Sequence, residues 1–205
     1  PRLSDALFFW QQDLKLPFTD AFPYLVKLSA LNYQKELGTV EKKVDRIVRL
    51  AKEIAHFLAI DSAAACRAAA FSKFDLVTKM VYEFPELQGL MGGYYAEKAG
   101  ESSAVAKAIS EHYLPTQAGT AIPSNVEGRI VALADKLDTL TGIFAIGQKP
   151  TASKDPYALR RAALGILRIL IEGQLPLDLR EILGGALQEQ PAGRRDEATL
   201  KDLLS

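Results

Sequence analysis

The chain has 205 residues, of which 48% are hydrophobic and 24% are charged, which suits a globular protein with a sizeable core, either one large domain or one domain with attached arms. Lysine plus arginine and aspartate plus glutamate both total 25, so no overall field draws nucleic acid to the chain, and RNA binding would need local patches. The single cysteine, Cys66, excludes an intramolecular disulfide and a thiolate zinc site.

Apolar residues recur with helical spacing through the first half of the chain. Between residues 40 and 58 they form one stripe with a period near 3.6, which predicts an amphipathic helix. The opposite, charged face is expected to be solvated and consists of Lys42, Arg46, Arg49 and Glu53. Further helical segments are predicted at about 61–71, 72–84, 86–100 and 101–113.

The second half continues the helical pattern between two loops rich in turn formers, 114–125 and 147–156. Asp155 followed by Pro156 predicts a helix start, with an N-cap side chain and then proline at the first helical position. Helices are predicted at 126–146, 157–172 and 178–188, and in the C-terminal GRRDEATLKDLLS, where Leu200, Leu203 and Leu204 lack an obvious partner.

Alternating apolar and polar residues, the signal of a strand, are nearly absent, so the predicted fold class is all-α. We expect an N-terminal helical arm or linker at 1–38, a helical domain at 39–175 and a truncated helical extension at 176–205. The chain begins at Pro1, which fits an internal piece of a longer protein.

Asp135 stands in the apolar helix predicted around VALADKLD (131–138), close to its apolar face. A carboxylate placed there needs a partner, a metal or a proton. It could equally form a salt bridge or accept an N–H bond within the core. Asp138, in contrast, is expected to be an exposed helix acid.

The same segment resembles the last metal-binding stretch of the HD-domain superfamily, all-α phosphohydrolases that bind divalent metal with an early His, a His-Asp dyad and a late Asp. The resemblance places the early position within 42–45, the dyad at Ser72-Lys73 or Phe74-Asp75, and the late acid at Asp135. Neither early stretch contains a histidine, and the Lys73 ammonium would repel a divalent ion but could neutralise Asp135. We therefore expect an HD-like helical bundle whose metal site is degenerate and binds no metal. The pocket would contain Ser72, Lys73, His112 and Asp135.

The chain has two histidines. His112, in EHYLP, could serve the pocket or simply favour the helix C-terminus. His56 is expected to be a packing residue on a mostly apolar helix. No phosphate-binding loop of the GxxxxGKS type, no HExxH, no GxSxG and no Rossmann glycine pattern occurs. We therefore expect no catalytic residue in this chain.

Several long motifs resemble the β subunit of the two-subunit bacterial glycyl-tRNA synthetase. They are QKELGT (34–39), DLVTKMVYEFPELQGLMG (75–92), ISEHYLP (109–115), VALADKLDTL (131–140) and PTASKDPYALRR (150–161). The resemblance covers most of residues 1–172, although Ala152 stands where the family usually has glycine.

This resemblance implies a part of an enzyme that uses ATP to join glycine to its tRNA in protein biosynthesis. It implies that the α subunit holds the active site with its ATP and magnesium, so that this part of the β subunit uses no cofactor. The implied partners are the α subunit and tRNA(Gly). No apolar run reaches the roughly 18–20 residues of a membrane span, so we expect no membrane partner and a cytoplasmic protein.

The candidate RNA contact is the basic segment 149–168, whose one acid is Asp155. Its cations are Lys149, Lys154, Arg160, Arg161 and Arg168. Arg161, Gly165 and Arg168 share one predicted helix face, where the glycine would let a phosphate backbone or another helix come close. The helix N-terminus after the loop also suits phosphate. Alternatively, these cations pair with acids of the same chain.

The leading functional hypothesis is a non-catalytic tRNA-binding and subunit-docking part of glycine–tRNA ligase. The first alternative is an active metal-dependent HD phosphohydrolase, which the missing histidines disfavour. The second is a scaffold that docks the α subunit without touching RNA. Sequence does not separate the second alternative from the leading hypothesis.

Overall fold

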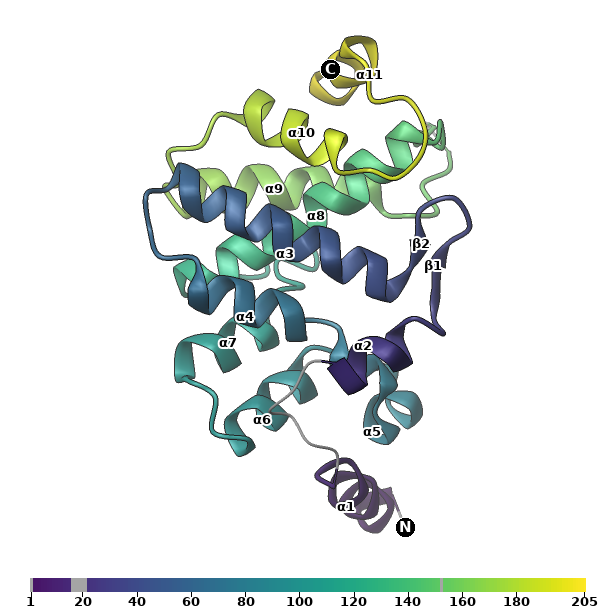
Figure 1. The fold of residues 1–205 in the computed structure, drawn as a ribbon, viewed down its shortest axis with the longest axis vertical. Coiled ribbons are helices and arrows are strands. Elements are labelled where there is room, and N and C mark those ends of the chain that lie inside the picture. The colour runs from purple at the N-terminus through teal and green to yellow at the C-terminus, as the bar shows by residue number, and fades with distance from the viewer. Residues whose placement is uncertain (1, 16–21, 152) are drawn as a thin grey trace.

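The computed structural model describes residues 2–15, 22–151 and 153–205, and its described part is mostly helical, which confirms the all-α prediction (Figure 1). The first helices are α1 (Arg2–Asp13), α2 (Phe22–Leu28), α3 (Val40–Phe57), α4 (Ala63–Phe71), α5 (Lys79–Glu83), α6 (Leu90–Lys98) and α7 (Ser103–Glu111). The later ones are α8 (Val126–Ala145), α9 (Leu159–Glu172), α10 (Leu179–Gln188) and α11 (Glu197–Leu204). Two 3-10 turns, η1 (Phe74–Val77) and η2 (Pro85–Leu87), and an antiparallel hairpin of β1 (Asn32–Gln34) and β2 (Gly38–Thr39) complete the elements.

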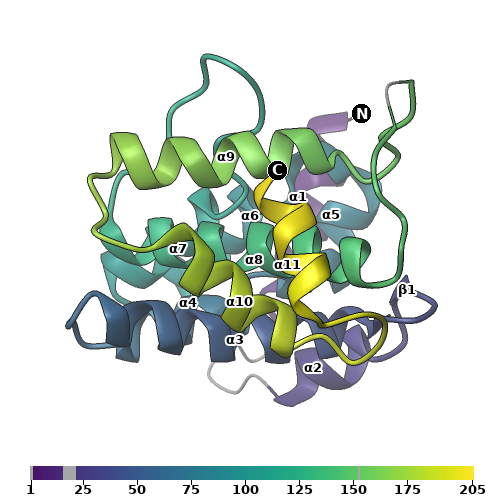
Figure 2. The ribbon, with the colours of Figure 1, turned by 90° about the horizontal axis from the view of Figure 1, so that it is seen from above.

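Helix α8 is the centre of the fold. It contacts α3, α4, α7, α9 and α10, and Figure 2 shows it between α9 on one side and α3 on the other. Most of its residues are buried, on every side of the helix, and Leu133 and Leu137 are fully inaccessible to solvent. Only a few of its residues, such as Glu127 and Lys136, are partly exposed, because other helices pack around most of α8.

Helix α3 begins where the sequence predicts, because Thr39 caps it: its hydroxyl accepts a hydrogen bond from the amide of Lys42 at 3.4 Å. Most of its apolar stripe, including Ile47 and Ile54, is buried against α4 and α8. The stripe therefore joins three helices into one core.

The single helix predicted over residues 72–84 is wrong, because the chain forms η1 and then α5. Thr78 breaks the run: it is extended, and its hydroxyl caps α5 by accepting from the amide of Val81 at 3.3 Å. Asp75, buried in η1, accepts from the amides of Gly89 at 2.6 Å and Gly92 at 3.0 Å. These bonds replace helical ones and fold the segment back on α6.

The start of α9 also differs from the prediction. The helix begins at Leu159, after Ala158 in the left-handed region with φ 54°. Asp155 is therefore not the N-cap, yet its carboxylate accepts from the amides of Leu159 at 2.8 Å and Arg160 at 3.1 Å. Asp155 thus accepts hydrogen bonds from the first amides of α9, as an N-cap side chain would, but it stands about one turn before the helix begins.

The first helix, α1, packs on α5, and the last helix, α11, packs on α10 and α8. The Asp13 carboxylate at the end of α1 accepts from the amides of Lys79 and Met80 and from the Tyr95 hydroxyl, at 2.8–3.0 Å. At the other end, Leu200 and Leu203 of α11 pack against the core, so the C-terminal helix finds a partner. The domain boundaries at 38/39 and 175/176 stay predictions. No helix of the described residues is long and apolar enough to cross a membrane.

Candidate functional site

Three positions far apart in the sequence meet at Asp135 in the middle of α8. Its Oδ1 lies 2.9 Å from the Nζ of Lys43 on α3, and its Oδ2 lies 2.6 Å from the Nζ of Lys73 after α4. Both lysine side chains are at least nine-tenths buried. The predicted neutralisation of Asp135 by Lys73 is confirmed, and Lys43, from the early motif stretch, supplies a second ammonium group.

His112 joins this cluster from the end of α7. Its Nε2 lies 2.9 Å from the Lys73 Nζ and its Nδ1 lies 2.6 Å from the carbonyl oxygen of Ile109. A neutral ring fits both contacts, with Nε2 accepting from the ammonium and Nδ1–H donating to the carbonyl. Burial, aided by the Lys73 charge, lowers the pKa of His112 to about 3. His112 therefore lies beside Lys73 as well as at the C-terminal end of α7, and its role in a pocket stays a prediction.

Ser72, the fourth predicted pocket residue, is buried but makes no polar contact with the cluster. Its hydroxyl donates to the carbonyl of Ala69 at 2.8 Å, within its own helix end. Neighbouring Lys73 instead lies 3.8 Å from the ring centroid of Tyr113, a cation–π contact that covers the ammonium.

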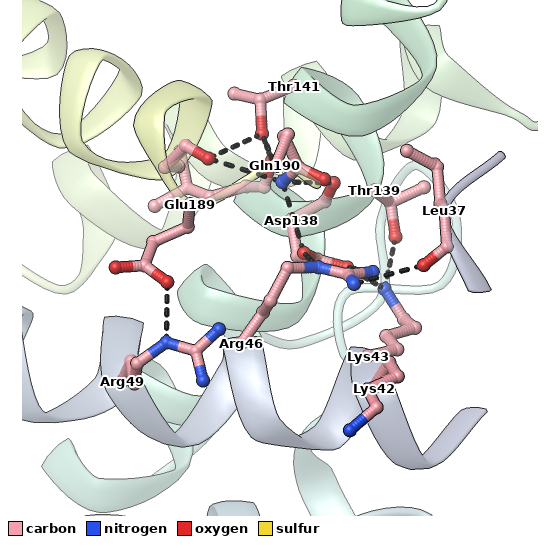
Figure 3. Close-up of polar contacts among 12 residues, drawn as sticks. Leu37, Lys42, Lys43, Arg46, Arg49, Asp138, Thr139, Thr141, Glu189 and Gln190 are labelled. Atoms are coloured by element: carbon pink, nitrogen blue, oxygen red, sulfur yellow. Dashed lines mark hydrogen bonds and ion pairs between the residues drawn. The ribbon is translucent and has the colours of Figure 1, made fainter. Parts of the chain in front are cut away.

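The expectation that Asp138 is an exposed acid is wrong, because its side chain is fully buried. Figure 3 shows its carboxylate between Lys43, Arg46 and Gln190. The Arg46 Nε donates to Oδ1 at 2.5 Å, the Lys43 Nζ donates to Oδ2 at 2.9 Å, and the Gln190 amide donates to Oδ1 at 3.1 Å. Arg46 is therefore also not on the solvated face of α3. Both corrections have one cause: α3 packs against the side of α8 that carries Asp138, so the carboxylate and Arg46 are buried together.

We call Lys43, Arg46, Lys73, His112, Asp135 and Asp138 the charge cluster. Burial opposes ionisation of Asp135, but the charges of Lys43 and Lys73 outweigh it and hold the pKa of this carboxyl well below its ordinary value. Both oxygens of Asp135 lie within ion-pair distance of an ammonium group, and this positive charge opposes the binding of a divalent ion. Among the described residues, no group of three or more His, Cys, Asp and Glu side chains is arranged to hold a metal.

His112 should make the stability of this region depend on pH. In the unfolded chain an imidazole takes up a proton near pH 6.5, whereas folded His112 resists protonation down to about pH 3. The free energy of unfolding should therefore fall as the pH drops below about 6.5, and His112→Gln should flatten this fall. The pH dependence of this free energy is measured by native-state hydrogen exchange of the α7 and α8 amides, corrected for the intrinsic exchange rate at each pH.

The matched control is His56→Gln, because His56 is exposed on α3 and is not the packing residue that the sequence predicts. Asp75 acts in the opposite direction between about pH 4 and pH 6, since burial raises the pKa of its carboxyl to about 6. The comparison is therefore between variant and parent at each pH. A His112→Gln slope equal to the parent slope would show that this imidazole is not held neutral.

The basic segment divides into paired and unpaired cations. Lys149 pairs with Asp202 of α11, Arg160 donates to the Thr151 carbonyl, and Arg168 forms a fork with Glu172 at 2.5 and 3.0 Å. In the part of the chain that the structure describes, the exposed side chains of Lys154 and Arg161 have no such partner. Two of the five candidates are thus free to bind a ligand.

Gly165 on α9 serves the packing of helices. A Cβ atom at this position would lie 2.6 Å from Cε of Lys136, so the missing side chain lets the Lys136 chain of α8 pass beneath α9. Of the two predicted uses of this glycine, a close approach within the protein is the one observed.

The outer face of α9 carries an apolar stripe that the sequence analysis missed. Leu164, Leu167 and Ile171 are 60%, 40% and 73% exposed. They lie at positions i, i+3 and i+7, and therefore on one side of the helix. The helical period of α9 shows apolar residues on two sides, and only the tertiary structure tells which side remains uncovered.

The comparisons with known proteins agree with one another. A family model described as "Glycyl-tRNA synthetase beta subunit" matches residues 1–205. The glycine–tRNA ligase β subunit of Aromatoleum aromaticum is 54% identical over 188 residues, which is 92% of this chain and 27% of that protein. The β subunit of Stutzerimonas stutzeri is 52% identical over 205 residues, 96% of this chain and 29% of that protein. The chain thus spans about a quarter of the length of these curated relatives.

Proposed function

The chain belongs to the glycyl-tRNA synthetase β subunit family, and from this premise we propose that it is a non-catalytic part of a glycine–tRNA ligase that contacts tRNA(Gly) and docks the α subunit. The complete enzyme would form glycyl-tRNA with ATP, and the α subunit would hold the site for glycine, ATP and magnesium. This part of the β subunit would need no cofactor of its own.

We also propose that the helices around α8 form an HD-like bundle with a degenerate metal site. Support comes from the convergence of three motif positions: the early stretch at Lys43, the dyad stretch at Lys73 and the late Asp135 lie within ion-pair distance of one another. Two ammonium groups stand where that motif would hold a metal. An active metal phosphohydrolase, the first alternative, therefore has no support in the charge cluster.

The observation that carries the RNA role is a pair of exposed cations, Lys154 before α9 and Arg161 in its first turn, which have no acidic partner among the described residues. A cation already paired to a carboxylate must break that pair to bind phosphate, whereas a free one gives up only water and counterions. The N-terminus of α9 itself is less available than predicted, because Asp155 already occupies the amides of Leu159 and Arg160.

The test is the double variant Lys154→Gln/Arg161→Gln in the intact α–β enzyme. If both cations meet duplex phosphates, tRNA affinity should fall at low salt, and the slope of log affinity against log salt should decrease by roughly 2, at about 0.9 per contact. Arg168→Gln is the contrast, since Glu172 already neutralises that guanidinium, and its slope should stay near the parental value. Filter binding at several salt concentrations measures both. Parental affinity and slope in the double variant would remove these cations from the RNA interface.

The same preparations test docking, for which the α9 stripe is the candidate surface. Leu164→Lys/Ile171→Lys places two charges on it and should weaken retention of the α subunit, because burying unpaired charges is costly. The Lys154/Arg161 variant should retain α normally. If neither variant changes tRNA binding while the stripe variant loses α, the scaffold alternative is the better description.

A further inference from the structure

A solvent-open hollow lies between α8, α9 and the segment that follows α7. Its volume is about 390 Å³, within the range of small-molecule sites. Its lining includes Gln88, Tyr113, Thr116, Lys136, Tyr157 and Arg161. Cationic, aromatic and hydrogen-bonding side chains therefore surround one concave space.

Lys136 is the unusual residue of this hollow, because it is a largely buried cation without an acid. Its Nζ donates to the carbonyl oxygen of Tyr113 at 3.1 Å, and no carboxylate of the described residues forms an ion pair with it. Burial lowers the pKa of Lys136 to about 8, the nearby Lys73 and Lys43 add to this, and Asp135 opposes it. A negatively charged ligand would supply the missing counter-charge.

The surroundings of the hollow add to its positive potential. Lys43, Arg46 and Lys73 pair with the two carboxylates of Asp135 and Asp138, and Lys136 is a fourth basic side chain, which bonds a backbone carbonyl instead. Asp75 nearby offsets one of the two extra charges at neutral pH, because a carboxyl whose pKa is raised to about 6 is still mostly ionised there, and a net positive charge remains. At the mouth, the unpaired Arg161 contributes a further cation, and exposed Glu86 is the one acid among the lining residues.

We propose that this hollow binds a nucleoside phosphate, with the phosphate between Lys136 and Arg161 and the base against the rings of Tyr113 and Tyr157. The cations of Lys136 and Arg161 and the hydroxyl of Thr116 suit phosphate oxygens. Aromatic rings stack on any of the nucleic-acid bases. The nucleotide is either an unpaired nucleotide of RNA or a free one. In the first case the inference rests on the proposed function and gives it a single-nucleotide subsite.

The test uses Lys136 itself as a reporter, with pyridoxal 5′-phosphate as the probe on the complete protein. The Lys136 amine adds to the probe's aldehyde and expels water to form an imine, which borohydride reduces to a stable amine. Mass spectrometry of peptides then gives the labelled fraction. If Arg161 holds the phosphate, the phosphorylated probe should label Lys136 about tenfold faster than pyridoxal, the gain expected from a charge-assisted hydrogen bond.

Arg161→Gln should abolish this preference for the phosphorylated probe. The matched control Lys52→Gln removes an exposed cation of α3 and should leave it unchanged. Arg161 is itself exposed, so its substitution does not threaten the fold. Equal labelling by both probes in the parent, or a preference that survives in Arg161→Gln, would overturn the phosphate site.

Competition identifies the source of the nucleotide. Protection of Lys136 by tRNA, but not by AMP, would assign the hollow to RNA, and protection by AMP alone would assign it to a free nucleotide. Absence of protection by both would overturn the proposal. Filter binding of tRNA on the same samples distinguishes failure of this site from failure of the proposed function. If tRNA binds normally without protecting Lys136, only the nucleotide site is refuted.

Discussion

Asp138→Ala is expected to lower the free energy of unfolding of the α3–α8 core by about 3–5 kcal/mol. The reason is that Asp138 accepts from Arg46, Lys43 and Gln190 while its side chain is fully buried. Its removal leaves a buried guanidinium and two other donors without this partner. Breaking one side of a buried ion pair costs far more than the pair contributes relative to an apolar replacement.

The measurement is native-state hydrogen exchange in the complete protein, which reports local stability where several domains prevent a single unfolding transition. Protection of α3 and α8 amides should fall by a factor of roughly 100 or more. The control is Asp45→Ala on α3, whose pair with Lys42 spans 3.7 Å between side chains that are 40% and 62% exposed. That exposed pair should contribute at most about 1 kcal/mol. Equal losses in the two variants would refute the structural role of Asp138.

The sequence predicts helix positions better than it predicts which charges are buried. The helix predicted at 40–58 is α3, and the one at 126–146 is α8, because a long apolar period is a local signal. The partner of Arg46 lies 92 positions away, so no local pattern reveals that this arginine faces inward. Asp138 was misplaced for the same reason.

The charge cluster was predictable in part, because a motif fixes spacing across helices. The motif positions brought Lys73 and Asp135 together correctly, and they pointed to the stretch that contains Lys43. The motif carries no information on Arg46 or on Gln190, which lies just after the C-terminal end of α10. The break in the helix at Thr78 is not visible in the sequence, because the amides that follow it, those of Lys79 and Met80, bond the carboxylate of the distant Asp13.

A double-mutant cycle on Lys73 and Asp135 tests whether their buried ion pair stabilises the fold. Asp135→Leu should cost about 3–5 kcal/mol, since the buried Lys73 ammonium is left with only a neutral imidazole and an aromatic ring. Lys73→Met should cost less, because Asp135 keeps the ion pair with Lys43 at 2.9 Å. The double variant should be more stable than Asp135→Leu, because an apolar pair of similar volume can replace a buried ion pair at little cost.

The coupling energy in this cycle should reach about 2 kcal/mol, measured by hydrogen exchange in α8. The same cycle on Arg180 and Glu197, which are 52% and 55% exposed, should give no more than about 1 kcal/mol. The pKa of Asp135 is held low in the folded state, so the stability that it contributes should be present above about pH 4 and be lost as the pH falls further. Additive effects of the two substitutions would show that Lys73 does not neutralise Asp135. Strong coupling would show that this buried ion pair holds α8 to the segment that follows α4.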